Sequence, residues 1–179
     1  MRGRIALGIL AVLLLLFAFY ITVEYPIEKE NEAIEKHVIE WTSRSQHSPE
    51  PQLKKGMHLG SSDTYIAFYT IGTNTAIASL KEGINGKLKM VQSSTGNSVA
   101  GYESIETNEG YYGAVRGRNR GNQIRSLKVE VQNTSIHFEL DVPKQPYFVL
   151  VKKLPDEIKE QTYGDLFFFN QENEPFTPE

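Results

Sequence analysis

The sequence predicts a mainly β protein, an antiparallel sandwich or barrel of about eight or nine strands, preceded by an N-terminal transmembrane helix and a short amphipathic stalk helix. Two patterns carry this prediction. Residues 5–23 are apolar without interruption, whereas apolar and polar residues alternate from Asp63 onward, which is the period of strands with one buried face. The 179 residues suit one domain, and the absence of cysteine excludes disulfides, cysteine zinc sites and thiol catalysis.

Residues 5–23 are the predicted transmembrane anchor, because they carry no charged side chain. A helix of this length, at a rise of about 1.5 Å per residue, extends about 28 Å, close to the thickness of the hydrocarbon core of a bilayer. Two arginines precede the segment and glutamates follow it. The positive-inside rule therefore predicts a cytoplasmic end at residues 1–4 and an extracytoplasmic C-terminal domain, in a single-pass protein of the cell membrane.

A cleaved signal peptide is the alternative interpretation of the same segment. Cleavage requires small residues near the end of the apolar run, but this run ends with the bulky residues of Phe19–Val23. A buried core helix of a soluble protein is disfavoured, because the segment has no polar face. We therefore expect an uncleaved signal-anchor whose residues 5–23 contact membrane lipid.

One face of the predicted span is rich in small or hydroxylated residues. These residues are Gly8, Ala11, Ala18 and Thr22, and Leu15 is the large residue on the same face. Small residues allow two helices to approach closely in lipid. This face is a candidate contact for a partner transmembrane helix or for a second copy of the chain. The alternative is an ordinary lipid-facing helix with scattered alanines.

A helical stalk is predicted over residues 24–41 and a linker over residues 42–62. The apolar residues of the stalk recur at helical spacing on one face, as Ile27, Ile34, Val38 and Trp41, and most of its other residues are Glu and Lys. The sequence leaves open whether this helix docks on the domain or pairs with another stalk. The linker is polar and contains two prolines and two glycines, which is typical of an irregular connection.

The extracytoplasmic β domain is predicted over residues 63–170. Its candidate strands, separated by turn signals, are residues 64–70, 75–81, 87–92, 102–107, 111–116, 124–132, 135–141, 147–153 and 165–170. Residues 154–160 predict a short helix, because a proline stands near their start and acidic residues follow it. The tail at residues 171–179 is acidic with two prolines, which predicts disorder.

Charge is segregated along the chain, although the net charge is only −3. The predicted stalk and residues 155–179 are acidic, whereas residues 42–154 are basic. Four of the seven arginines lie in one glycine-rich window, as Arg116, Arg118, Arg120 and Arg125. Guanidinium groups bind phosphate or carboxylate in a bidentate manner, so this loop is a candidate anion-binding site for anionic lipid or wall polymer. The alternatives are a solvated hairpin tip and pairing with the acidic tail.

No catalytic residue, metal ligand or cofactor is predicted. The four histidines are not spaced as a ligand pair, and the sequence contains no nucleophile elbow, phosphate-binding loop or EF-hand pattern. Nucleic acid is not expected as a partner, because the net charge is negative and the predicted compartment is wrong. The sequence favours a non-enzymatic binding or sensing module that contacts anionic envelope components. A cell-envelope enzyme with a site of strand-end carboxylates and tyrosines, and a structural subunit of a membrane complex, are the alternatives.

Two short stretches, Lys81–Lys87 (KEGINGK) and Pro143–Phe148 (PKQPYF), resemble segments of small, uncharacterised membrane-anchored envelope proteins of Gram-positive bacteria. The layout of a short cytoplasmic end, one anchor, a charged stalk and a cysteine-free β domain is similar to theirs as well. The resemblance implies no catalytic residue.

Overall fold

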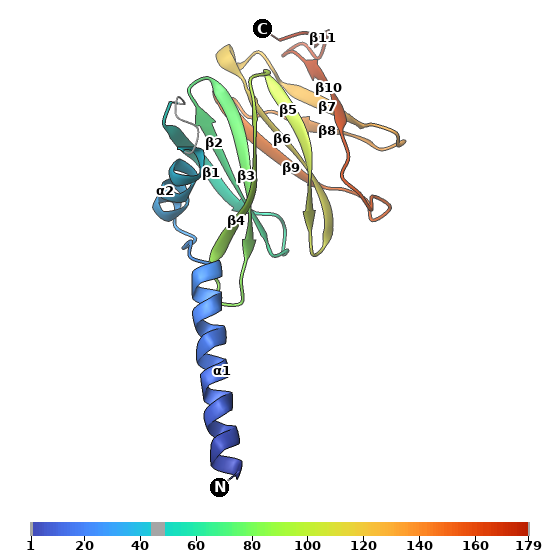
Figure 1. The fold of residues 1–179 in the computed structure, drawn as a ribbon. Helices are drawn as coiled ribbons and strands as arrows, with labels where there is room; N and C mark the ends of the chain where they lie inside the picture. The colour runs from blue at the N-terminus through green and yellow to red at the C-terminus, as the bar shows by residue number, and fades with distance from the viewer. Residues whose placement is uncertain (1, 44–48, 179) are drawn as a thin grey trace.

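The computed structural model describes residues 2–43 and 49–178. Within these residues two helices precede eleven strands, which form three antiparallel sheets and do not close into a barrel (Figure 1). The mainly β, antiparallel fold predicted from the sequence is therefore confirmed. Met1 of the predicted cytoplasmic end, residues 44–48 of the predicted linker and Glu179 of the predicted tail lie outside the described residues.

Helix α1 (Arg2–Glu24) projects from the domain, and the strands lie beyond its C-terminal end (Figure 1). Its segment Ile5–Glu24 has a mean hydropathy of 2.7, and none of the apolar window is buried against the rest of the chain. The helix is long and apolar enough to cross a membrane, in agreement with the predicted span at residues 5–23.

Helix α2 (Asn31–Thr42) lies on the domain and does not continue α1 as a stalk. The chain leaves α1 at Glu24, passes Pro26 and then lays α2 along the first sheet, where Ile34 and Val38 are fully buried. The predicted amphipathic helix is thus present, over a shorter range than 24–41. The sequence left open whether this helix docks on the β domain or pairs with another stalk, and in the structure it docks on the domain. Its apolar face is covered by the chain's own sheet.

Sheet A has the strand order β1-β2-β3-β4, with β1 (Pro51–His58), β2 (Thr64–Ile71), β3 (Asn74–Glu82) and β4 (Leu88–Gly96). Sheet B contains β5 (Ala100–Thr107), β6 (Gly110–Arg118) and β9 (Tyr147–Lys153). Sheet C has the order β11 (Pro175–Phe176), β10 (Gly164–Phe169), β7 (Ser126–Val131) and β8 (His137–Asp141). Each of the predicted strands is present, with bounds shifted by a few residues.

The elements stack in four layers, α2, sheet A, sheet B and sheet C. One core joins α2 to sheet A through Ile34, Val38, Ala67, Tyr69 and Leu80. A second joins sheets A and B through Ile66, Phe68, Ile77, Ile105, Ala114 and Val149. A third joins sheets B and C through Val115, Phe148, Leu127, Val129 and Phe138. Sheet B is covered on both faces, which explains why residues 147–151 of its strand β9 are an uninterrupted apolar run.

Three local expectations are corrected by the structure. The predicted linker contains strand β1, which pairs with β2. Residues 154–160 form no helix; they make a turn in which the Ile158 N–H donates to the Pro155 carbonyl oxygen (3.0 Å). In the predicted disordered tail, β11 pairs with β10, and Phe176 packs against the core between sheets B and C.

The domain has two ends relative to α1 (Figure 1). The β3–β4 turn lies beside the C-terminal end of α1, and the β1–β2 loop and β5–β6 turn share this proximal end. They are joined there by the Glu82 N–H, which donates to the Asp63 carbonyl oxygen (2.7 Å), and by the Asp63 N–H, which donates to Asn108 Oδ1 (2.9 Å). Strand β6 runs away from this end, so the segment between β6 and β7 lies at the opposite, distal end (Figure 1).

Candidate functional site

Arg116, the first of the predicted anion-binding arginines, is buried between sheets A and B. Its Nη1 donates to Glu103 Oε1 at 2.5 Å, and its Nε donates to the Thr75 carbonyl oxygen at 3.2 Å. The side chains of Arg116 and Glu103 are only 8% and 13% exposed. Room for the guanidinium comes from Gly96, where a Cβ would stand 3.1 Å from Arg116 Nη2. Arg116 therefore holds the two sheets together and does not belong to an exposed anion-binding surface, which corrects the prediction for this residue.

Glu103 is the centre of this buried polar cluster. Ser94 Oγ donates to its Oε1 (2.7 Å), so β4, β5 and β6 each contribute one member of the cluster. Burial raises the pKa of Glu103 above its ordinary value, and the Ser94 hydrogen bond and the Arg116 charge offset only part of this rise. Nearby on the other face of sheet A, burial also raises the pKa of Tyr69, whose hydroxyl shares a hydrogen bond with Ser93 Oγ (2.5 Å).

The raised pKa of Glu103 makes stability depend on pH. The native state holds this proton more tightly than the unfolded state, so its contribution to stability is present below the ordinary pKa of 4.5 and is lost as pH rises through the raised native pKa. Glu103→Gln should flatten this part of the curve of unfolding free energy against pH. Urea denaturation at stepwise pH measures the slope, and a slope unchanged by the substitution would contradict the assignment.

The other three predicted arginines lie at the distal end. Arg118 is half-buried and its Nη2 donates to the Asn97 carbonyl oxygen (3.0 Å), whereas Arg120 and Arg125 are exposed. The loop that carries them is shaped by Asn119, which is 1% exposed. Asn119 Nδ2 donates to the Ile124 carbonyl oxygen (2.9 Å), and its Oδ1 accepts from the Ile124 N–H (2.9 Å). These bonds, not the glycines alone, fix the positions of the exposed arginines.

A groove of about 680 Å³ adjoins this loop. It runs between β1 and β9 and is lined by Lys54, Lys55, Phe68, Asp141, Val142, Pro143 and Gln145–Leu150. Consecutive residues of β9 line it, so the groove follows an edge of that strand; within the described residues β9 pairs along its other edge with β6. Lys54 Nζ stands 5.5 Å from the centre of the Tyr147 ring, which places a cation over an aromatic face inside the groove.

The exposed arginine loop and the groove form one continuous structure. Asn119 Nδ2 donates to the Pro143 carbonyl oxygen (3.3 Å), and the Val142 N–H donates to the Arg125 carbonyl oxygen (2.8 Å). We call four exposed cations of this region the distal basic surface; they are Lys54, Lys55, Arg120 and Arg125. One carboxylate, Asp141, lies beside them in the groove. Lys54 and Lys55 were not among the residues predicted from the sequence, because they fall in the stretch interpreted as a linker.

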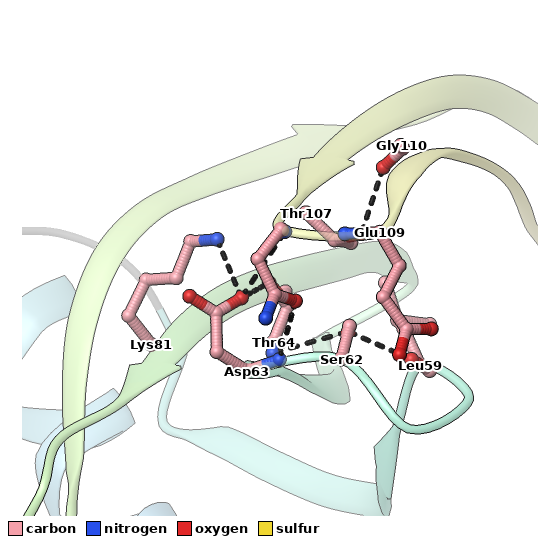
Figure 2. Close-up of polar contacts among 9 residues, drawn as sticks. Leu59, Ser62, Asp63, Thr64, Lys81, Thr107, Glu109 and Gly110 are labelled. Carbon is pink, nitrogen blue, oxygen red and sulfur yellow. Dashed lines mark hydrogen bonds and ion pairs between the residues drawn. The ribbon is translucent and has the colours of Figure 1, made fainter. Parts of the chain in front are cut away.

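The proximal end carries a second polar cluster, drawn in Figure 2. The Asp63 carboxylate accepts from Lys81 Nζ (2.9 Å) and from Thr64 Oγ1 (3.0 Å). Burial raises the pKa of Asp63, but these hydrogen bonds and the Lys81 charge outweigh it and hold that pKa below its ordinary value. On the β5–β6 side, Thr107 Oγ1 donates to the Gly110 carbonyl oxygen (2.7 Å). The polar groups of this cluster bond to one another, so it joins the two sheets at their proximal end.

A smaller groove of about 440 Å³ opens beside the Asp63 cluster, between β4 and β5. Polar side chains line most of it, among them Lys81, Gln92, Glu106 and Asn108. Among the described residues, no group of three or more His, Asp or Glu side chains lies close enough together to hold a metal ion.

The predicted helix-packing residues Gly8, Ala11, Ala18 and Thr22 all lie on α1 and are exposed in the single chain. A Cβ at Gly8 would meet no atom within 4 Å. The Thr22 hydroxyl donates to the Ala18 carbonyl oxygen of its own helix (2.9 Å) and so needs no partner in lipid. A contact of this face with a second helix stays a prediction.

Comparisons of the chain with protein-family models, with curated protein sequences and with solved structures gave no match. The class of the protein therefore follows from its own architecture. It is a β-rich domain of three antiparallel sheets that carries, at its N-terminus, one helix long and apolar enough to span a membrane.

Proposed function

We propose that this protein is a single-pass protein of the cell membrane, with a cytoplasmic N-terminus, and that its extracytoplasmic domain is a non-enzymatic binding module for an anionic polymer of the cell envelope. The support for the membrane location is the apolar helix α1 together with the arginines before it and the glutamates after it. The support for binding is the distal basic surface with its adjoining groove.

The observation that carries the proposal is the position of the distal basic surface. Strand β6 has nine residues and begins at the proximal end, so its length of about 27 Å separates the exposed arginines from the end beside α1. The Debye length at physiological salt is about 8 Å, and charges several Debye lengths apart are screened. Even a strand inclined by about 45° to the membrane normal would leave these arginines more than two Debye lengths from the lipid headgroups. An anionic polymer that extends as far from the membrane as these arginines is therefore a better partner for them than the lipid of the membrane that α1 would cross.

The chemistry of the surface suits repeated phosphate or carboxylate groups. Arg120 and Arg125 offer guanidinium forks, which bind such groups in a bidentate manner. Lys54 and Lys55 add two ammonium groups on the wall of the groove, and Tyr147 adds an aromatic face. An extended anionic chain that follows the groove would contact both sets of cations.

We expect the variant Lys54→Gln/Lys55→Gln/Arg120→Gln/Arg125→Gln to bind anionic polymer on the order of a thousandfold more weakly, because each of the four cations contributes about 1 kcal/mol near an anionic surface and about 1.4 kcal/mol is tenfold. The full chain in nanodiscs of uncharged phosphatidylcholine would be titrated with long-chain inorganic polyphosphate at several salt concentrations. The parent should also show affinity that falls as salt rises.

The control variant Lys36→Gln/Lys152→Gln/Lys153→Gln/Lys159→Gln removes the same charge from exposed sites outside this surface. An equal loss in both variants, or no binding by the parent, would refute the site. Free vesicles of phosphatidylglycerol serve as a second probe, and tighter binding to them than to polyphosphate would replace the polymer by a lipid surface.

A further inference from the structure

The β3–β4 turn, residues 83–87, exposes an isoleucine at its tip. Ile84 is 79% exposed, more than any other large apolar side chain among the described residues. Two backbone hydrogen bonds close the turn. The Gly83 N–H donates to the Lys87 carbonyl oxygen (2.8 Å), and the Gly86 N–H donates to the Gly83 carbonyl oxygen (2.9 Å). Moving an isoleucine side chain from water into an apolar medium gains about 1.5–3 kcal/mol, so contact with lipid at this turn would be favourable.

This turn lies at the depth of the last helical turn of α1 (Figure 1). The Asn85 side-chain amide donates to the carbonyl oxygens of Tyr25 (3.2 Å) and Ile21 (3.4 Å). Ile21 belongs to the apolar segment Ile5–Glu24. Ile84, the residue before Asn85, therefore lies level with the end of the segment that would occupy the bilayer.

The Tyr25 ring packs directly on the turn. A Cβ at Gly83 would stand 2.5 Å from Tyr25 Cγ, so only glycine allows this approach without displacing the ring. Tyr20, five residues earlier in the last part of α1, is 57% exposed. Tyrosines concentrate at the interface between lipid and water, so the pair marks the level at which α1 leaves the bilayer.

Backbone hydrogen bonds and ion pairs join the β3–β4 hairpin to the end of α1 and to the segment that follows it. Ile27 and Leu88 exchange two backbone hydrogen bonds, at 3.0 and 2.7 Å. Ion pairs lie on either side of this bridge, and they join Lys87 to Glu28, Lys29 to Glu82 and Lys89 to Glu24. The hairpin is thereby attached to both the last turn of α1 and the segment after it.

From this geometry we infer that the β3–β4 turn is a second membrane contact, in which Ile84 enters the interfacial layer of the bilayer that α1 crosses. The inference rests on the membrane-spanning role proposed for α1, and it adds a lipid-binding site on the β domain itself. Two separated contacts, one helix and one turn, would prevent the domain from rotating freely about its anchor. The distal basic surface then always points away from the lipid.

The absence of cysteine makes a direct test possible, because single cysteines can be introduced and spin-labelled. We would compare Ile84→Cys, Phe17→Cys in α1 and Thr73→Cys in the full chain, reconstituted into phosphatidylcholine vesicles. Thr73 is an exposed residue in the turn at the other end of strand β3 and is the matched control. The accessibility of each nitroxide to oxygen, which is enriched in lipid, and to a water-soluble nickel chelate reports its depth.

The label at 84 should be shielded from the nickel chelate and accessible to oxygen, at a depth between those of the labels at 17 and 73. A label at 84 as water-accessible as the label at 73, with the label at 17 in lipid, would overturn the turn contact and leave the anchor intact. A label at 17 in water would instead overturn the membrane-spanning role of α1, and the turn contact with it.

A second variant tests whether α1 holds the turn in place. Lys87→Glu/Lys89→Glu in the Ile84→Cys chain sets like charges against Glu28 and Glu24, and the label should move toward water. The same reversal at Lys152 and Lys153, on β9, should leave its depth unchanged. Equal depths in the parent and the Lys87→Glu/Lys89→Glu chain would refute the coupling.

Discussion

Arg116→Met should lower the free energy of unfolding by about 3–5 kcal/mol, the usual cost of removing one partner of a buried ion pair. The substitution leaves the Glu103 carboxylate 13% exposed, with Ser94 as its remaining hydrogen-bond donor. The cost is the desolvation of an unpaired charge, so it should shrink at low pH, where Glu103 takes up a proton. Urea denaturation of the full chain in detergent micelles measures both quantities.

Two controls separate this effect from a general loss of packing. Lys128→Met breaks the ion pair with Glu130, whose side chains are 30% and 47% exposed, and should cost about 0–1 kcal/mol. In Arg116→Met/Glu103→Gln the unpaired charge is gone, so part of the loss should be recovered. A loss below about 1 kcal/mol for Arg116→Met, or no recovery in the double variant, would contradict the role assigned to the pair.

Phe148→Ala should cost about 3–5 kcal/mol, because it empties a fully packed site between sheets B and C. Phe148 is 2% exposed, and its ring lies over Gly117 on the neighbouring strand, where a Cβ would be 2.5 Å from Cζ. Both faces of sheet B are closely packed, so the remaining side chains have little freedom to close the cavity. The loss is measured by the same urea titration.

Phe167→Ala is the matched control, since that ring is 45% exposed and its removal should cost about 1 kcal/mol. Gly117→Ala alone should cost about 1–3 kcal/mol through its clash with the ring. The same change in the Phe148→Ala background should cost less, because the ring atoms are gone and the contact with Ala100 Cβ, at 2.9 Å from the new Cβ, is the close one that remains. Additive losses from the two substitutions would show that the ring and the glycine are not in contact.

The strands from β2 to β10 could be predicted because their signals are local. Alternation in residues such as Leu127, Val129 and Val131, with turn residues between the runs, places each strand without knowledge of its neighbours. Strand β1 has no such pattern, because a register shift between Leu53 and Lys55 interrupts its alternation. Its identity as a strand depends on its pairing with β2, which lies outside the segment itself.

The predicted helix at residues 154–160 and the predicted disordered tail were wrong because contacts distant in sequence outweigh their local signals. The acids and proline of residues 154–160 favour a helix locally, but Leu154 and Ile158 are buried against the core between sheets B and C, and the segment is a turn. The tail is acidic, yet Phe176 packs on that core, and this contact outweighs the local preference for disorder. Tertiary packing decides both segments.

The predicted arginine cluster could be only partly anticipated. Composition identifies the window but gives no information about which side of a strand each residue occupies. Arg116 falls on the face of β6 that meets sheet A. On the neighbouring β5 its register partner is Gly101, and Glu103 lies two residues further along the same face, so the ion pair is a diagonal contact that arises from strand register. Lys54 and Lys55 reach the groove only because β1 joins sheet A beside β9, so no local signal could have added them.

The bridge between Ile27 and Leu88 has a mechanical consequence. It leaves no free joint between α1 and the hairpin. With α1 in a bilayer, as proposed above, the domain would act as a lever whose fulcrum lies at the lipid surface. Membrane helices tilt over a range of tens of degrees, and a change of about 10° would swing the tip of a lever about 27 Å long by about 5 Å. A change in bilayer thickness that is accommodated by tilting of α1 would thus displace the arginines at the far end sideways.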